Sequence, residues 1–369
     1  MSQEELASQL ETHFEKQLPF VIYSKPGAAK LQVIFQEDKK LHTTSTYEEE
    51  GFVFAPFDSN QPGILIKGKP TEIIVSSAAV EFNSVEKTIE TKDADQHIAL
   101  VEKAIETITD SDLKKVVLSR KQNLSIEASS PIPLFFRLNQ KYPTAFTYLW
   151  HHPEVGTWLG ATPETLLALK GQRLETMALA GTQSYSGSTD VVWGLKEQEE
   201  QQMVTDEIAS KLAGFDFKSF RVHDRETYRA GGLLHLRTKI TGNLAPTENP
   251  LKALLSALHP TPAVCGLPRD LAKSFINEHE SYDRGFYTGF LGEINQLQDH
   301  SKRRTRRNVE NLAYKTVKKT SELYVNLRCM QFKPQMASLY VGGGITAGSD
   351  AKQEWHETVN KAQTIASIL

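Results

Sequence analysis

The sequence predicts an α+β fold in which large antiparallel sheets pack against helices, and three observations support it. Five short apolar runs separated by turn residues lie within residues 20–76, a spacing typical of successive antiparallel strands. Several later segments have the periodicity of amphipathic helices. Strands and helices then follow one another without the regular alternation of a parallel, doubly wound sheet, so a Rossmann-type fold is not expected.

Residues 1–94 are expected to be a strand-rich part of one structural domain that continues through residues 95–369. The opening segment, MSQEELASQLETHFEKQLPF, has a charged helical pattern and lacks the apolar run of a signal peptide. The strands expected after it are FVIYS, LQVIFQE, FVFAPF, GILIKG and TEIIVS.

The larger part, residues 95–369, carries longer elements of both kinds. The segment 93–110 places Ile98, Val101, Ala104 and Ile105 on one helix face, and it leads into the expected strand KKVVLSRKQNL. The other expected helices are 194–213, 249–260, 268–280 and the last 18 or so residues; the other expected strands are 145–151, 157–162, 165–170, 175–181, 287–294, 321–331 and 337–345.

Composition sets the broad class of the protein. A net charge of -3 over 369 residues gives no general attraction to nucleic acids or membranes, and no apolar run reaches the roughly 18 residues of a membrane span. Cys265 and Cys329 lie far apart among apolar neighbours, which is typical of buried thiols in a reduced, cytoplasmic protein. The segment 302–319 is strongly basic, but no aromatic stacking platform accompanies the charge, so we expect a solvated hairpin insertion there.

Two single residues are candidates for acid–base chemistry. Lys115 heads the apolar run KVVLSR; a lysine there is usually a strand end that reaches solvent, and it becomes a base only if burial lowers its pKa toward neutral. Glu164 lies in GATPE between two apolar runs. It is commonly a turn acid, and it acts as a general acid only if the apolar setting raises its pKa.

Two pairs of glutamates have E-x-x-E spacing on expected helices. Glu197 and Glu200 lie in KEQEEQQMV, and Glu354 and Glu357 lie in EWHET, so the members of each pair share a helix face. A single pair is usually a solvated acidic face. Two pairs without a Cys/His cluster indicate a hard cation held by oxygen ligands, Mg²⁺ rather than Zn²⁺.

Three consecutive glycines, Gly342, Gly343 and Gly344, follow an expected strand and suggest at first a phosphate-binding loop. The run lacks the Lys-Ser/Thr of a P-loop, and neither a dinucleotide-binding glycine motif nor a G-x-S-x-G elbow occurs in the chain. A nucleotide site is therefore not expected.

Nine motifs of this sequence, in order, resemble those of the chorismate-utilising enzymes. That family includes isochorismate and salicylate synthases and the large subunits of anthranilate and aminodeoxychorismate synthases. The resemblance covers the chain from about residue 95 and implies the family fold, two antiparallel sheets packed between helices with a cleft between halves. The motifs are KVVLSR (115–120), GATPE (160–164), LAGT (179–182), KEQEEQQMV (196–204), HPTPAVCG (259–266), YDRGFYTG (282–289), NLRC (326–329), GGGI (342–345) and EWHET (354–358).

Three positions favour the isochorismate synthase reaction within this family. Water-using members carry lysine where Lys115 stands and ammonia-using members carry glutamine, consistent with the need of water for a base. Ala180 stands where one type of aminodeoxychorismate synthase has a nucleophilic lysine, so that covalent route is closed. Ala263 resembles isochorismate synthases, whereas salicylate synthases, the nearest alternative, more often have threonine.

The resemblance also implies a role for each site residue. Lys115 would take a proton from water that attacks C2 of chorismate, and Glu164 would protonate the departing C4 hydroxyl. Mg²⁺ would hold the ring carboxylate, with Glu200 and Glu357 as direct ligands and Glu197 and Glu354 holding its waters. Arg328 and Lys361 would bind the enolpyruvyl carboxylate, and the glycines would close on a carboxylate. The substrate-binding residues implied are Gly181, Thr182, His235, Ala263, Arg328, Gly342, Gly344 and Lys361.

Chorismate is the partner expected, bound to a monomer without a glutaminase subunit, a nucleic acid or a membrane. The product would serve menaquinone or siderophore biosynthesis. Two other classes remain open: a non-catalytic chorismate- or anion-binding protein, and nucleic-acid binding through segment 302–319. The chain also departs from its relatives: Gln201 and Gln202 replace a His and a Glu that often follow the ligand glutamate, and Ala178 stands where relatives have proline.

Overall fold

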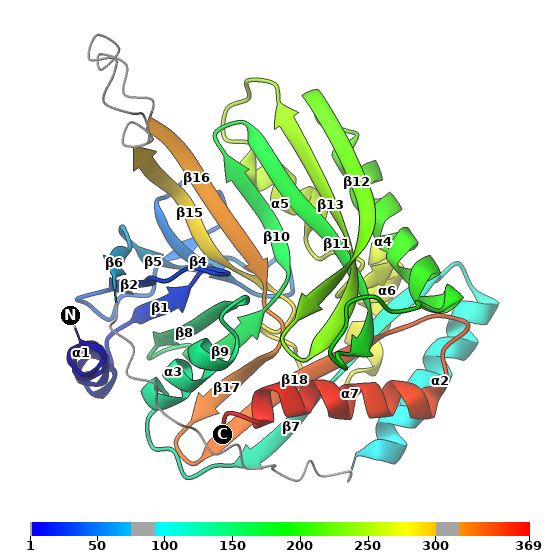
Figure 1. Cartoon of the computed structure of the whole chain (residues 1–369), viewed down its shortest axis with the longest axis horizontal. Coiled ribbons are helices and arrows are strands. Elements are labelled where there is room, and N and C mark those ends of the chain that lie inside the picture. Colours follow the sequence, from blue (N-terminus) through cyan, green and yellow to red (C-terminus); the bar gives the residue numbers. More distant parts are fainter. Residues whose placement is uncertain (1, 75–92, 300–316) are drawn as a thin grey trace.

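The computed structural model describes residues 2–74, 93–299 and 317–369, which form two antiparallel sheets covered by helices (Figure 1). Each sheet has nine strands in these residues, and every neighbouring pair is antiparallel. The α+β fold expected from the sequence is confirmed.

The strands of the first sheet are, in spatial order, β14 (Gly266–Leu267), β7 (Lys115–Ser125), β18 (Met336–Ile345), β17 (Cys329–Lys333), β9 (Gly156–Thr162), β8 (Phe146–His152), β1 (Phe20–Ser24), β2 (Leu31–Phe35) and β6 (Thr71–Ile73). Those of the second sheet are β12 (Phe217–Ala230), β13 (Leu233–Leu244), β11 (Arg173–Ser184), β10 (Thr165–Lys170), β16 (Val317–Val325), β15 (Phe290–Asp299), β4 (Gly51–Ala55), β5 (Gly63–Lys67) and β3 (Thr43–Thr44). The helices are α1 (Gln3–Glu15), α2 (Ala94–Asp110), α3 (Ile132–Lys141), α4 (Leu195–Leu212), α5 (Leu251–Leu258), α6 (Arg269–His279) and α7 (Ala351–Ala366).

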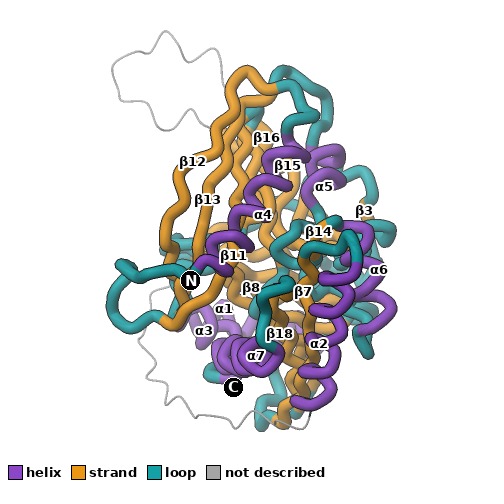
Figure 2. The backbone as a smooth tube through the Cα atoms, turned by 90° about the vertical axis from the view of Figure 1, so that its right-hand side faces the viewer, coloured by secondary structure: helices purple, strands orange, loops and turns teal. Residues whose placement is uncertain are grey.

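An aromatic core holds the two sheets together. Phe52 and Phe54 of β4 pack against Phe146, Tyr148 and other rings of the first sheet. Aromatic side chains bury the most apolar area per residue, and their offset and edge-on contacts add to it. Separate apolar clusters lie outside the sheets, one under α1 and α3, one under α2 and α6, and one under α4 and α5. Figure 2 shows α2, α4, α5, α6 and α7 gathered on one side of the molecule.

The N-terminal strands are divided between the two sheets. β1, β2 and β6 extend the first sheet, and β3, β4 and β5 extend the second. Helix α1 begins with a capping box, in which the Ser2 hydroxyl accepts from the Glu5 N–H and the Glu5 carboxylate accepts from the Ser2 N–H. The residues up to 74 are therefore part of both layers.

Two regions of regular structure were not expected from the sequence. Helix α3 is short and has prolines in its first turn, although its Leu134, Phe135 and Leu138 are buried. The second region is the β12–β13 hairpin. Most β12 side chains are exposed, so the strand lacks the apolar alternation that marks a half-buried strand, and pairing with β13 stabilises it.

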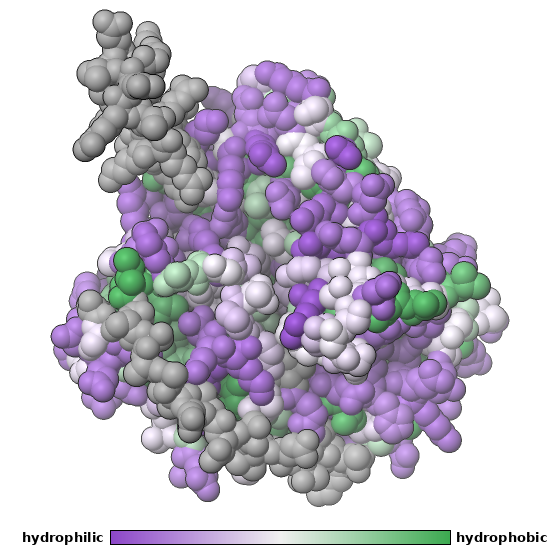
Figure 3. Space-filling model, in the orientation of Figure 1, coloured by the Kyte–Doolittle hydropathy of each residue, from purple (hydrophilic) through white to green (hydrophobic). Residues whose placement is uncertain are grey.

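Some expectations fall outside the described residues. Strands β15 and β16 pair as a hairpin, but residues 300–316, which hold most of the basic segment, are not described. The expected strand TEIIVS is seen over Thr71–Ile73. Among the helices of the described part, none is long and apolar enough to cross a membrane. On the face drawn in Figure 3, hydrophilic side chains predominate.

Candidate active site

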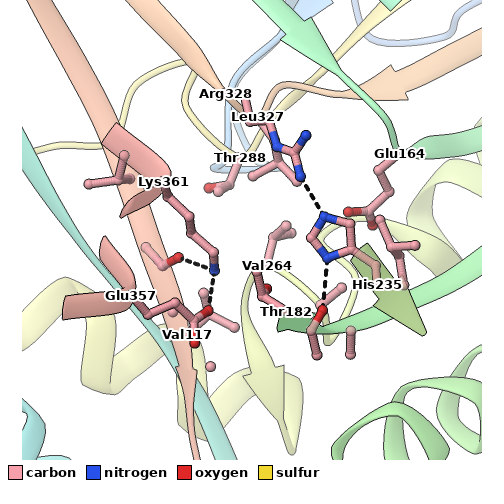
Figure 4. Close-up of a pocket in the computed structure, with 18 of the residues that line it drawn as sticks. Val117, Glu164, Thr182, His235, Val264, Thr288, Leu327, Arg328, Glu357 and Lys361 are labelled. Carbon is pink, nitrogen blue, oxygen red and sulfur yellow. Dashed lines mark hydrogen bonds and ion pairs between the residues drawn. The ribbon is translucent and has the colours of Figure 1, made fainter. Parts of the chain in front are cut away.

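A cavity between the two sheets collects the residues that the sequence singled out. The open space, including its mouth, is roughly 990 Å³. Its walls come from the ends of β11 and β18, the first two turns of α4, helix α7 and the turns between strands. Figure 4 shows part of this lining. Thirteen of the fourteen predicted site residues line it: Glu164, Gly181, Thr182, Glu197, Glu200, His235, Ala263, Arg328, Gly342, Gly344, Glu354, Glu357 and Lys361.

Lys115, the fourteenth, lies immediately behind this lining. It is the first residue of β7 and is fully buried. Its Nζ lies 2.9 Å from Glu200 Oε1, an ion pair by distance, although the two groups are not aligned as a hydrogen bond. Its Cε would be 3.0 Å from a Cβ added to Gly344. Lys115 therefore lies against Glu200 and Gly344, two residues that line the cavity.

Glu164 lies in the turn between β9 and β10 and is 3% exposed. Burial raises the pKa of its carboxyl group to about 8, although the positive charges of Lys115 and Arg328 oppose the shift. The carboxyl group is therefore largely protonated at neutral pH. The apolar setting expected to favour a general acid is present.

Arg328 and His235 form a hydrogen-bonded pair beside Glu164 (Figure 4). His235 Nδ1 donates to the carbonyl of Gly181 at 2.8 Å, which leaves Nε2 to accept from Arg328 Nη2. The other terminal nitrogen of Arg328 donates to the carbonyl of Ala230 at 3.0 Å. Burial, and then the field of Arg328, lower the pKa of His235 to about 3, so the ring is neutral and holds the guanidinium in place.

Three lysines are paired with glutamates on the opposite side of the cavity. Besides the Lys115–Glu200 contact, Lys361 lies 2.6 Å from Glu357, and Lys196 lies 2.6 Å from Glu354. Glu354 is buried, which raises its pKa. Burial acts in the same direction on Glu357, but the charges of Lys361 and Lys196 and the hydrogen bonds from Lys361 and Thr182 together outweigh it, so the pKa of Glu357 is lowered.

Lys196 was not among the predicted site residues. It belongs to the motif KEQEEQQMV, lines the cavity and binds Glu354 through Nζ. Tyr287, Thr288, Leu327 and Tyr340 also line the cavity without having been singled out. Their positions within or beside the quoted motifs were the available signal, but a motif does not say which of its side chains face inward.

The acidic residues of the cavity suit a magnesium ion by their chemistry. Four of the five, all but Glu164, lie on α4 and α7, and Mg²⁺ binds few protein oxygens because it keeps several waters. Within the described residues, no three Asp, Glu, His or Cys side chains are grouped closely enough to hold a metal. Glu200 and Glu357 each lie against a lysine instead, Lys115 and Lys361.

The three glycines lie in strand β18 rather than in a turn. They pair with Ser119, Leu118 and Val117 of β7. β17 pairs with β18 only as far as Tyr340, so the glycines have no strand on their other edge within the described residues. There the carbonyl of Gly342 accepts from Lys361 at 2.9 Å.

The missing side chains of these glycines leave room for charged groups. A Cβ at Gly344 would lie 2.4 Å from Glu200 Oε1, and one at Gly343 would lie 3.2 Å from Glu354 Oε2. Any larger residue at 344 would thus push Glu200 out of its present position. The glycines allow carboxylates of the chain itself to approach the backbone closely, and their expected role toward a substrate carboxylate stays a prediction.

Comparisons with known proteins give one consistent family. A family model described as "Chorismate binding enzyme" matches residues 68–300, and a second chorismate-binding model matches residues 312–367. The isochorismate synthase MenF of Escherichia coli is 30% identical over 282 residues, which cover 73% of this chain and 59% of that protein. The isochorismate synthase DhbC of Bacillus subtilis is 30% identical over 289 residues, or 73% of this chain and 66% of that protein.

Solved structures share the fold. The structure of the menaquinone-specific isochorismate synthase MenF from Escherichia coli matches with a TM-score of 0.75 at 23% identity, covering 95% of this chain and 88% of the other. A 2,3-dihydroxybenzoate-specific isochorismate synthase, described as putative, DhbC from Bacillus anthracis, matches with a TM-score of 0.77 at 22% identity, covering 98% and 99%.

Proposed function

The chain belongs to the family of chorismate-binding enzymes, and we propose that within this family it is an isochorismate synthase, an isomerase that converts chorismate to isochorismate. The observation that carries the proposal is that a buried acid with a raised pKa, Glu164, lines the cavity and a buried lysine, Lys115, lies directly behind its lining. Moving a hydroxyl group between two carbons of the substrate ring needs a base to activate water and an acid to protonate the hydroxyl that leaves.

The residues of the chain act as follows. Lys115, in its neutral form, takes a proton from the water that attacks C2 of chorismate. Glu164 gives its proton to the C4 hydroxyl, which departs as water as the double bonds shift. One water enters and one leaves, so substrate and product are isomers. The same two groups exchange roles in the reverse direction.

The two carboxylates of chorismate are held at separate places. Arg328 presents a guanidinium already oriented by His235, and it binds the enolpyruvyl carboxylate together with Lys361. Glu200 and Glu357 would hold Mg²⁺, with Glu197 and Glu354 beside them on the same helices. When bound, the ion supplies positive charge at the ring carboxylate.

The alternative with the closest chemistry is a salicylate synthase, which would also eliminate pyruvate. Ala263, which lines the cavity, favours isochorismate synthase. The two curated relatives described above are named isochorismate synthases, which supports the same choice. The protein is expected to act alone in the cytoplasm, and its product would enter menaquinone or siderophore synthesis.

The test is incubation of the purified chain with chorismate and Mg²⁺, with products separated by chromatography and pyruvate measured in a coupled assay. Isochorismate without pyruvate is the expected result. Salicylate with an equal amount of pyruvate would assign the alternative reaction, and unchanged chorismate would favour a non-catalytic binding protein.

A further inference from the structure

A buried ion pair lies behind the cavity, where β14 ends beside β7. β14 pairs with β7 only at Lys115 and Val116. The N–H of Val117 still reaches the carbonyl of Cys265 at 2.8 Å. Beyond that point, no strand of the described residues lies along this edge of β7.

Arg284 and Glu280 take the place of the missing strand. Arg284 Nη2 donates to the carbonyl of Val117 at 2.6 Å, and the N–H of Ser119 donates to Glu280 Oε1 at 2.7 Å. A neighbouring antiparallel strand would supply one donor and one acceptor in the same way. The ion pair therefore continues the hydrogen bonding of β7 by one further step.

The remaining donors of Arg284 bind other segments. Nη1 donates to the carbonyl of Val264 at 2.9 Å and to Thr288 Oγ1 at 3.3 Å. Nε donates to Glu280 Oε2 at 2.8 Å, and Nη2 also contacts Glu280 Oε1. The five N–H groups of the guanidinium are thus all engaged, which is the condition under which a buried ion pair is tolerated. The two side chains are 2% and 1% exposed.

Three of these partners come from different segments and line the cavity: Val117 from β7, Val264 from the loop before β14, and Thr288 from the turn before β15. Lys115 lies two residues before Val117 on the same strand. We propose that Arg284 and Glu280 are positioning residues for the reaction, because they fix the strand that carries the base against two other walls of the site. This inference rests on the proposed function.

A lysine at 284 could keep the charge but not the planar fork that reaches Glu280 and two carbonyls at once. The start of β7 would then be held less firmly, and a displacement of about 1 Å in a catalytic group can cost about a hundredfold in rate. Arg328 and Lys361, which are proposed to bind the substrate, lie on other segments, so substrate affinity should change little. Arg284→Lys should therefore lower kcat at least about tenfold and change KM less than about threefold.

A second buried ion pair of the chain offers a matched control. Glu293 accepts from Lys25 at 2.8 Å and from the Tyr23 hydroxyl, between the sheets and outside the cavity lining. Glu293→Gln removes a buried charge from a network of similar kind without touching β7. Its kcat per folded molecule should stay within about twofold of the unchanged chain.

The experiment measures kcat and KM for chorismate, with thermal melting and near-UV circular dichroism to establish the folded fraction at the assay temperature. Glu280→Gln is the second variant, because it keeps the shape of the side chain and serves if Arg284→Lys does not fold. It should lower kcat with little change in KM. The inference is overturned if the folded variants Arg284→Lys and Glu280→Gln, or whichever of them folds, keep kcat within twofold of the unchanged chain. It is also overturned if Glu293→Gln loses as much kcat as they do. An inactive unchanged chain instead overturns the proposed function.

Discussion

The two sides of the cavity differ in whether their charged groups are free to bind a ligand or are already bound to each other. On one side, which we call the arginine wall (Glu164, His235 and Arg328), the guanidinium is held by a neutral ring and a carbonyl. On the other, the acidic wall (Glu197, Glu200, Glu354 and Glu357), three of the four carboxylates are bound to lysines. Under the proposed function, Arg328 is already oriented for the substrate, whereas the carboxylates of the acidic wall would have to leave their lysines to bind a cation.

We expect the largest loss of activity when one of the two proposed acid–base groups is removed. We expect Glu164→Gln to lower kcat by about 10²–10⁴, because an amide of the same shape cannot donate the proton that the leaving hydroxyl needs. Lys115→Ala should lower kcat by a similar factor, because it removes the proposed base. Steady-state kinetics at pH 7 measures both. Glu154→Gln, at an exposed position, is the control. Near-full activity in either variant would show that the acid–base assignment is wrong.

Cation binding tests the acidic wall. Glu200→Gln and Glu357→Gln should each weaken Mg²⁺ binding by about a hundredfold, since each removes one of two direct ligands. Titration calorimetry with Mg²⁺ alone measures this without turnover. Glu278→Gln, whose side chain is 74% exposed, should bind Mg²⁺ like the unchanged chain. Equal affinity in all four proteins would place the ion elsewhere.

Substrate affinity tests the arginine wall. Arg328→Lys should raise KM by about 10–100-fold, because a lysine cannot make the paired hydrogen bonds of a guanidinium to a carboxylate. His235→Phe should raise KM less, since it removes the support of Arg328 but not its charge. A smaller effect for Arg328→Lys than for His235→Phe would contradict the proposed order.

The last prediction concerns stability against pH rather than activity or binding. The pKa of Glu164 rises from 4.5 to about 8 on folding, so the folded chain binds this proton more tightly than the unfolded chain. Its contribution is favourable below about pH 4.5 and is lost as pH rises toward 8. At pH 9 the cost is of the order of 5 kcal/mol. Glu164→Gln should therefore raise the melting temperature at pH 9 relative to the unchanged chain, and by more than at pH 5. An equal difference at both values would mean that Glu164 ionises normally.

Much of this site could be predicted because its residues come in short motifs, and spacing alone places Glu197 beside Glu200 and Glu354 beside Glu357. The lysine partners of these glutamates could not be predicted, because Lys196 and Glu354 are 158 residues apart in the sequence. Burial was equally inaccessible, because Lys115 looks like a solvated strand end until β14, Glu200 and Gly344 enclose it. In the fold, β12 was missed because its side chains carry no apolar alternation.

The division of the N-terminal strands between both sheets has a consequence for how the chain acquires its structure. β1 pairs with β8 and β4 pairs with β15, so Tyr23 bonds to Glu293 across 270 residues. Contacts between segments so far apart in the sequence require long loops to close before the contacts can stabilise the fold. Folding is slower as a result, and unpaired strand edges stay exposed in the meantime. During synthesis β4 has to wait for β15, and the catalytic strand β7 for β18. A fragment that begins at residue 95 would lack six strands and would leave Phe146 and Tyr148 uncovered, so the part that carries every proposed site residue is not expected to fold alone.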